Sequence, residues 1–223
     1  MPVRRQIGLA GRLLVLSQRA MPDSAAIRDG LTTIANGWRP LAVGWHVGLA
    51  ALMAGLTMGW RPSNRTAGWL LIAPLVSVAA MAWMSNNPFN GGIFAALALL
   101  LGRLTFRLSQ APVETGSRWL LAAGALMVVL AWGYPHFLET ERWTTYAYAA
   151  PLGLIPCPTL SAVIGATLIL DRLNARSWSI ALAGAGIVYG AIGVFGLGVT
   201  LDIVLLAGAL LLAAGLPLER ARS

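Results

Sequence analysis

The sequence predicts an all-α fold, a polytopic transmembrane helical bundle of about seven helices in which prolines break the fifth helix. Composition supports this fold, because 57% of the 223 residues are hydrophobic, 11% are charged and the mean hydropathy is +0.72. Apolar runs of about 20 residues, long enough to cross about 30 Å of hydrocarbon, recur along the chain. Tryptophans, whose rings prefer the headgroup layer, mark the ends of these runs at Trp38, Trp60, Trp69, Trp119, Trp143 and Trp178.

Composition and charge exclude other classes of protein. The single cysteine, Cys157, cannot form an intramolecular disulfide, and the apolar content is too high for a disordered chain. The net charge of +8 comes from 16 basic residues that are all arginine, which in a membrane chain indicates orientation and contact with membrane lipids, above all anionic ones. No motif indicates a nucleic-acid partner, and no cofactor is expected.

We divide the chain into an N-terminal arm, residues 1–37, and a transmembrane domain, residues 38–223. Charge, proline or glycine bounds each of seven expected spans within this domain. The spans run over residues 41–59, 67–84, 89–106, 119–138, 148–170, 178–196 and 199–218.

The N-terminal arm has two interpretations. Arg5, Arg12 and Arg19 recur every seven residues beside an apolar patch, a pattern that suits an interfacial amphipathic helix. Alternatively, translation starts at Met21 and the first twenty residues are not made. Arg12 interrupts the apolar run and so argues against a cleavable signal peptide.

The distribution of arginine predicts the orientation. The loops after the first, third and fifth spans, together with the C-terminal tail, carry nine arginines, whereas the opposite loops carry only Arg142. Because arginine resists translocation, we expect a multi-pass protein of the bacterial inner (plasma) membrane with its C-terminus in the cytoplasm. The arm places six more arginines on the outer side, and a start at Met21 would reduce these to Arg28 and Arg39.

Three pairs of glycines, spaced four residues apart on apolar helices, permit close helix approach. Packing within the bundle is their expected use, and a homo-oligomer or a larger membrane complex is the alternative. The pairs are Gly44 with Gly48, Gly55 with Gly59, and Gly186 with Gly190.

The fifth span contains Pro151, Pro156 and Pro158. Each proline lacks a backbone N–H and disfavours the helical conformation in the residue before it. The sequence therefore predicts an irregular stretch over residues 151–157, followed by a regular half-helix from Pro158 to Leu170. Because irregular backbone at membrane depth persists only where protein or water satisfies it, this break indicates a binding site. The N-terminus of the half-helix would favour an anion or a carboxylate.

Polar residues of other spans enter the bilayer from the same side as the break, or lie near its middle. Buried polar and ionisable groups are costly in lipid and tend to face a cavity or one another, so we expect an outward-facing ligand-binding vestibule. Its candidate residues are His46, Asn87, Tyr134, His136, Tyr148, Cys157, Thr159 and Asp202.

Four of these candidates also have a purely structural interpretation. Tyr134 and His136 suit interface anchors, Asp202 suits a helix cap and Cys157 suits a packing residue. The histidines, Cys157 and Asp202 are donors for zinc or copper, but no paired ligand spacing supports a metal site. No catalytic residues are assigned, because no catalytic triad, phosphate loop or spaced carboxylate pair is present.

Several short elements carry a resemblance. They are Asn87-Pro88, Tyr134-Pro135, and Pro151 followed by Pro156-Cys157-Pro158-Thr159. With the spacing of the seven spans, they make the chain similar to an uncharacterised family of bacterial polytopic membrane proteins that carry a domain of unknown function. The similarity covers roughly Asp23 to the C-terminus, which favours Met21 as the start.

The chain departs from that family at Thr144 to Tyr148, where members often carry a His-Pro-Tyr-Pro-like element. No ligand role is therefore carried over to this position. The resemblance implies the fold and brings no activity. From the residues, we expect binding or transport of a small solute; the alternatives are a structural or assembly subunit and a thiol-dependent or metal-binding membrane protein that uses Cys157.

Overall fold

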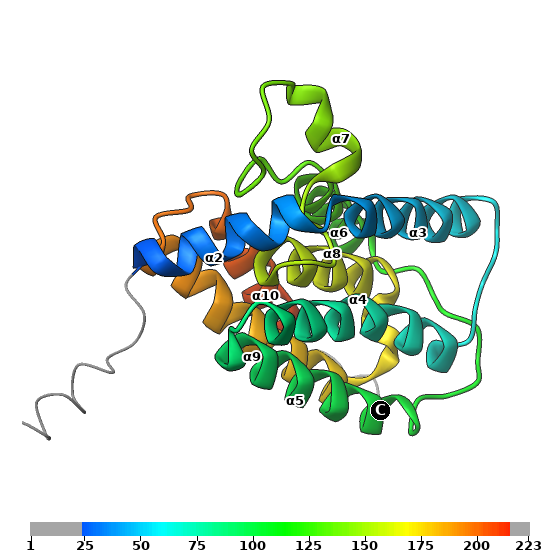
Figure 1. Cartoon of the computed structure of the whole chain (residues 1–223). Helices are drawn as coiled ribbons and strands as arrows, with labels where there is room; N and C mark the ends of the chain where they lie inside the picture. The colour runs from blue at the N-terminus through cyan, green and yellow to red at the C-terminus, as the bar shows by residue number, and fades with distance from the viewer. Residues whose placement is uncertain (1–23, 215–223) are drawn as a thin grey trace, which may run out of the picture.

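The computed structural model describes residues 24–214, and this part of the chain is all-helical with no β-sheet. It contains nine α-helices (Figure 1). The helices are α2 (Ser24–Gly37), α3 (Arg39–Thr57), α4 (Asn64–Met84), α5 (Pro88–Thr105), α6 (Arg118–Trp132), α7 (Tyr146–Ala149), α8 (Pro156–Ile169), α9 (Arg176–Ala191) and α10 (Asp202–Ala214). Two 3-10 turns lie before α7 and between α8 and α9, at Trp143–Thr145 and Asp171–Asn174. A π-helical turn, Ile192–Gly196, follows α9.

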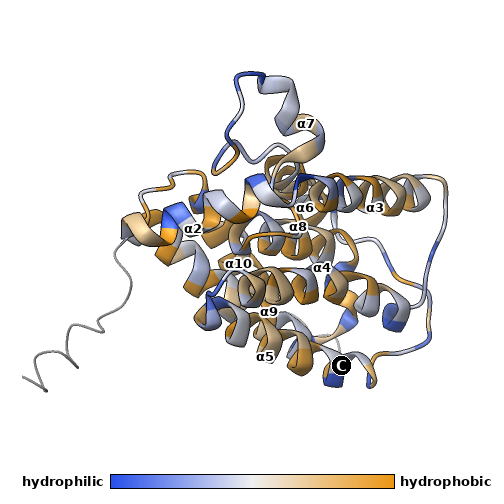
Figure 2. Ribbon diagram, in the orientation of Figure 1, coloured by the Kyte–Doolittle hydropathy of each residue, from blue (hydrophilic) through white to orange (hydrophobic). Residues whose placement is uncertain are grey.

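Within residues 24–214, four helical segments are long and apolar enough to cross a membrane, which supports a membrane location. They are α3, α4, α5 and the continuous stretch Arg176–Gly196, each of 18 to 21 residues. Figure 2 shows the same pattern, with apolar residues over the helices and hydrophilic residues gathered in the connecting loops.

The expected count of about seven helices differs from the nine observed between residues 24 and 214. Two additions explain the difference. The fifth expected span divides into α7 and α8, and the described part of the arm forms α2. Helices α6 and α8 have 15 and 14 residues, or about 21–23 Å at 1.5 Å per residue, so both are shorter than the hydrocarbon layer, and α10 has 13 residues within the described part of the chain.

Helix α8 lies at the centre of the bundle, where α4, α6, α9 and α10 pack against it (Figure 1). Every residue from Ala150 to Leu168 is buried. The predicted break is present, since the backbone from Pro151 to Ile155 is irregular and turns before the helix begins. The helix begins at Pro156, two residues earlier than expected, because a proline is tolerated in the first helical turn.

Helix α3 lies at the edge of the bundle. Only 11% of its membrane-length window is buried, whereas the other three long helices have 39–50% buried. No described residue lies within 4 Å of a Cβ built on Gly44 or Gly48, so this glycine pair makes no close helix contact within residues 24–214. Gly186 and Gly190, by contrast, lie against α10, as expected.

The connections gather at two ends of the bundle. At one end the α3–α4 loop meets the α5–α6 loop, where the Val113 N–H donates to the Pro62 carbonyl oxygen at 2.8 Å. The Gly116 N–H donates to the Ile169 carbonyl oxygen at 2.9 Å, which adds the end of α8 to this group. This end carries Arg61, Arg65, Arg103, Arg107, Arg118, Arg172 and Arg176.

Helix α2 lies at the opposite end, and its buried residues Leu31, Ile34 and Ala35 form one face. The Asn36 side-chain amide donates to the Phe137 carbonyl oxygen at 3.1 Å and so joins α2 to the loop after α6. The predictions about Arg5, Arg12, Arg19 and the Met21 start concern residues outside the described part of the chain.

Candidate functional site

Three of the predicted site residues meet at the N-terminal turn of α8. Tyr134, in the loop after α6, donates a hydrogen bond from its hydroxyl to Asp202 Oδ1 at 2.8 Å. Cys157, the second residue of α8, faces the same carboxylate and interacts with it. We call these three residues the Asp202 cluster. The cluster is closed to solvent, since Asp202 is 1% exposed, Tyr134 2% and Cys157 8%.

The second oxygen of the Asp202 carboxylate is buried without a hydrogen-bond partner among the described residues. It lies against the backbone of Gly193, and a Cβ built on that glycine would overlap the carboxylate. Gly193 belongs to the π-helical turn that follows α9, and such turns are frequent at functional sites. A buried carboxylate oxygen is costly without a donor or a cation, so Oδ2 is the unfilled position of the cluster.

Two further groups extend the Asp202 cluster. The ring of His136 lies 5.2 Å from that of Tyr134, centroid to centroid, and its Nδ1 is another buried polar atom without a hydrogen-bond partner among the described residues. The second group is a buried pair, in which the Tyr189 hydroxyl donates to Asn90 Oδ1 at 2.9 Å. Asn90 and Tyr189 were not predicted as site residues, although each is a polar residue inside an expected span.

Four other predicted site residues have separate roles. Thr159 holds the irregular turn, because its hydroxyl donates to the Ile155 carbonyl oxygen at 2.7 Å and accepts from the Gly153 N–H at 2.9 Å. Asn87 caps α5 through its side-chain oxygen, which accepts from the Asn90 N–H. Tyr148 is 54% exposed on α7, away from the cluster.

His46 joins two helices instead of lining the cluster. Its Nδ1 lies 2.8 Å from the Ala42 carbonyl oxygen on its own helix, and its Nε2 lies 2.9 Å from the Trp132 carbonyl oxygen at the end of α6. The imidazole is 2% exposed and also contacts the Trp132 ring edge-on. This histidine therefore attaches the peripheral α3 to the bundle.

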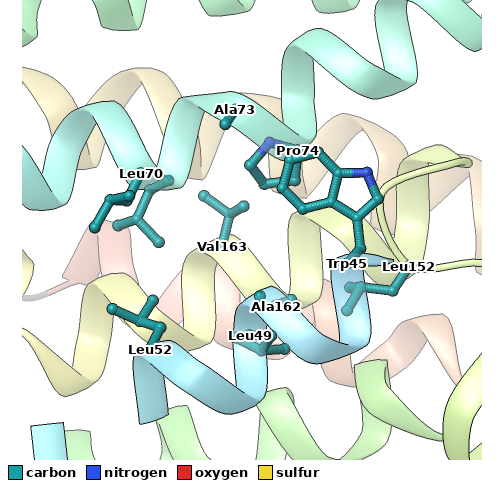
Figure 3. Close-up of a pocket in the computed structure, with 11 residues that line it drawn as sticks. Trp45, Leu49, Leu52, Leu70, Ala73, Pro74, Leu152, Ala162 and Val163 are labelled. Carbon is teal, nitrogen blue, oxygen red and sulfur yellow. The ribbon is translucent and has the colours of Figure 1, made fainter. Parts of the chain in front are cut away.

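A separate apolar groove of about 160 Å³ lies between α3, α4 and α8 (Figure 3). Its lining residues carry no charge, so the groove suits a hydrocarbon group. Gly153, with φ of +72°, packs against the Trp45 side chain, and a Cβ on this glycine would overlap the indole. The labelled lining residues are Trp45, Leu49, Leu52, Leu70, Ala73, Pro74, Leu152, Ala162 and Val163.

Within residues 24–214, no group of three histidine, cysteine, aspartate or glutamate side chains is arranged to hold a metal ion. The Asp202 cluster therefore offers a carboxylate, a phenol and a thiol as hydrogen-bonding groups for a small ligand.

Comparison with known protein families, curated proteins and solved structures finds no match to this chain. The resemblance carried by the Pro156-Cys157-Pro158-Thr159 element stays a prediction.

Proposed function

We propose that the chain is a seven-span protein of the bacterial inner membrane, with its C-terminus in the cytoplasm, that binds or moves a small solute at the Asp202 cluster. One observation carries this proposal: Asp202 is an almost fully buried carboxylate, and one of its oxygens has no hydrogen-bond partner between residues 24 and 214. Ionisable residues inside membrane proteins are costly, and they commonly mark ion, proton or substrate sites.

The charge of the cluster bears on the class of solute. Asp202 lies near Cys157 in the first turn of α8, so the positive end of this helix already has a carboxyl group beside it. The position at Oδ2 favours a group that donates a hydrogen bond or carries positive charge. We therefore propose a cation, an amine or a proton as the ligand, although the sequence pattern alone favoured an anion or a carboxylate.

Thermal unfolding in detergent at fixed pH tests this solute class. Small amines and monovalent cations should raise the unfolding midpoint of the wild type, because a ligand that binds only the folded state stabilises it. Asp202→Asn should abolish the rise. Asp29→Asn removes an exposed carboxylate of α2 and should keep it. Stabilisation by anions alone, or an unchanged response in Asp202→Asn, would contradict the proposal.

Labelling of Cys157 tests access to the cluster. Because the thiol is buried in this conformation, a membrane-impermeant maleimide added to intact cells should label it slowly, through transient opening. A solute that binds the cluster should slow the labelling further. If neither an impermeant nor a permeant maleimide reacts before denaturation, Cys157 is a packing residue, and the solute-site proposal fails.

One observation favours the assembly-subunit alternative. Gly44 and Gly48 lie on the least buried of the four membrane-length helices, and no described residue lies within 4 Å of a Cβ built on either glycine. Glycines with this spacing permit close approach of another membrane helix. If the chain is such a subunit, mild detergent should release it with stoichiometric partners, and Gly48→Leu should remove them without lowering the stability of the chain itself.

A further inference from the structure

A second cavity, of about 390 Å³, opens at the arginine-rich end of the bundle. It lies between the end of α5 and the start of α9, remote in sequence from every residue of the Asp202 cluster. Arg107 and Ser109 line it from the segment after α5, and Arg176 and Ser177 line it from the first turn of α9. We call this cavity the headgroup pocket.

The two arginines of the headgroup pocket are exposed, and neither guanidinium has a partner within residues 24–214. No carboxylate from residues 24–214 lines the pocket. The nearest acidic side chains by position, Glu114 and Asp171, line a separate crevice next to it. Two unpaired guanidiniums at one cavity create a positive potential that an anion would neutralise, and arginine matches the oxygens of a phosphate.

The first turn of α9 adds to this potential. Its N-cap residue, Ala175, has no side chain that can satisfy the free N–H groups of the turn. The hydroxyls of Ser109 and Ser177 supply two neutral donors at the same cavity. These groups add to the two arginines, which are the main reason to expect an anion in the pocket.

The connection that shapes the pocket is strained. Residues 171–174 all have positive φ, between +43° and +59°, and none of the four is glycine. Left-handed backbone is unfavourable for such residues, and it persists at sites where the surrounding structure enforces it. Leu173 and Asn174, from this turn, line the headgroup pocket.

The remaining wall is apolar and includes Leu104, Leu108 and Trp178. Charged groups beside apolar ones suit an amphiphile better than a free ion. The pocket also lies at the ends of α5 and α9, where a membrane bundle meets the headgroup layer. Basic pockets between helices on the cytoplasmic side bind anionic lipid headgroups.

We propose that the headgroup pocket binds the phosphate of an anionic phospholipid, with Arg107 and Arg176 holding the phosphate oxygens and the partly exposed Leu104 contacting the start of the acyl chains. The inference rests on the membrane placement of the bundle and not on the Asp202 cluster. Loss of the cluster by Asp202→Asn should leave lipid binding unchanged, so the two proposals fail separately.

Native mass spectrometry and thermal unfolding of the full chain in mild detergent test this site. The probes are phosphatidylglycerol, phosphatidylcholine and inorganic phosphate at matched concentration. Phosphatidylglycerol should bind and raise the unfolding midpoint more than phosphatidylcholine. Arg107→Gln and Arg176→Gln should each weaken its binding about tenfold, since a charge-assisted hydrogen bond contributes roughly that factor.

Arg118→Gln is the matched control, because Arg118 is an exposed arginine at the same end that does not line the pocket. It should keep the wild-type response. Three results would overturn the proposal: equal binding of the two lipids, an equal loss in the control, or full replacement of the lipid effect by inorganic phosphate. If a glutamine variant does not fold, Arg107→Lys and Arg176→Lys keep the charge and should lose only part of the affinity.

Discussion

At the scale of single residues, the hydrogen bond from Tyr134 to Asp202 satisfies one oxygen of a buried carboxylate. Tyr134→Phe would remove this donor from Oδ1. We expect the free energy of unfolding to fall by about 1–3 kcal/mol, the cost of a buried acceptor that loses its donor. Chemical denaturation in detergent measures the loss.

The double variant Tyr134→Phe with Asp202→Asn provides the control for that hydrogen bond. A neutral amide is less costly to bury than a carboxylate, so the effect of Tyr134→Phe should shrink in the asparagine background. If the two effects simply add, Tyr134 and Asp202 are not coupled, and the account of the cluster is wrong.

Gly193 makes a second prediction at this scale. A Cβ on Gly193 would overlap the Asp202 carboxylate, so Gly193→Ala should destabilise the protein by about 1–3 kcal/mol, as overpacking does. Gly184→Ala, in α9, meets open space and should be neutral or stabilising by up to about 1 kcal/mol. Thermal unfolding of the two variants in parallel compares them, and equal midpoints would contradict the predicted contact.

At the scale of elements, α6 and α8 cross where Gly124 faces Gly165. A Cβ on Gly165 would lie 2.6 Å from the Gly124 carbonyl oxygen, so Gly165→Ala should push the helices apart and cost about 1–3 kcal/mol. Gly48→Ala, in α3, has nothing within 4 Å and serves as the control. A smaller loss of unfolding free energy for Gly165→Ala than for Gly48→Ala would refute the close crossing.

The sequence predicted some of these contacts between elements and missed others for a physical reason. Spacing along one helix shows where small residues share a face, so the close packing of Gly186 and Gly190 could be predicted. Gly124 and Gly165 are single glycines on different helices, and only the fold brings them together. Gly44 and Gly48 have the same spacing as the first pair, but no described residue lies within 4 Å of a Cβ built on either, because helix periodicity does not say what packs opposite a given face.

Prediction of the site has the same limits. The three prolines correctly indicated the break before α8, because their effect on the backbone is local. Tyr134, Cys157 and Asp202 were grouped by the side of the bilayer from which their spans enter, and they do meet. His46 and Thr159 satisfied the same criterion but hydrogen-bond to backbone groups, which depends on side-chain directions that the sequence does not specify.

At the scale of the whole molecule, the contacts between loops define two ends that differ in charge. Loops that are far apart in sequence meet at the arginine-rich end, as the Val113–Pro62 and Gly116–Ile169 hydrogen bonds demonstrate. The Asn36–Phe137 hydrogen bond joins segments of the opposite end, where Arg28, Arg39 and Arg142 are the arginines of the described residues. The imbalance favours a cytoplasmic position for the arginine-rich end.

Cysteine accessibility in a Cys157→Ser background tests this orientation. Thr115→Cys places a thiol at an exposed position of the arginine-rich end, and Thr144→Cys places one in the exposed loop of the other end. An impermeant maleimide added to intact cells should label Thr144→Cys and spare Thr115→Cys, whereas membrane disruption should make both reactive. Because the arginines resist translocation, the reverse pattern would require an inverted protein and would place the headgroup pocket on the outer leaflet. Labelling of both thiols in intact cells would contradict a membrane-spanning bundle with these two ends.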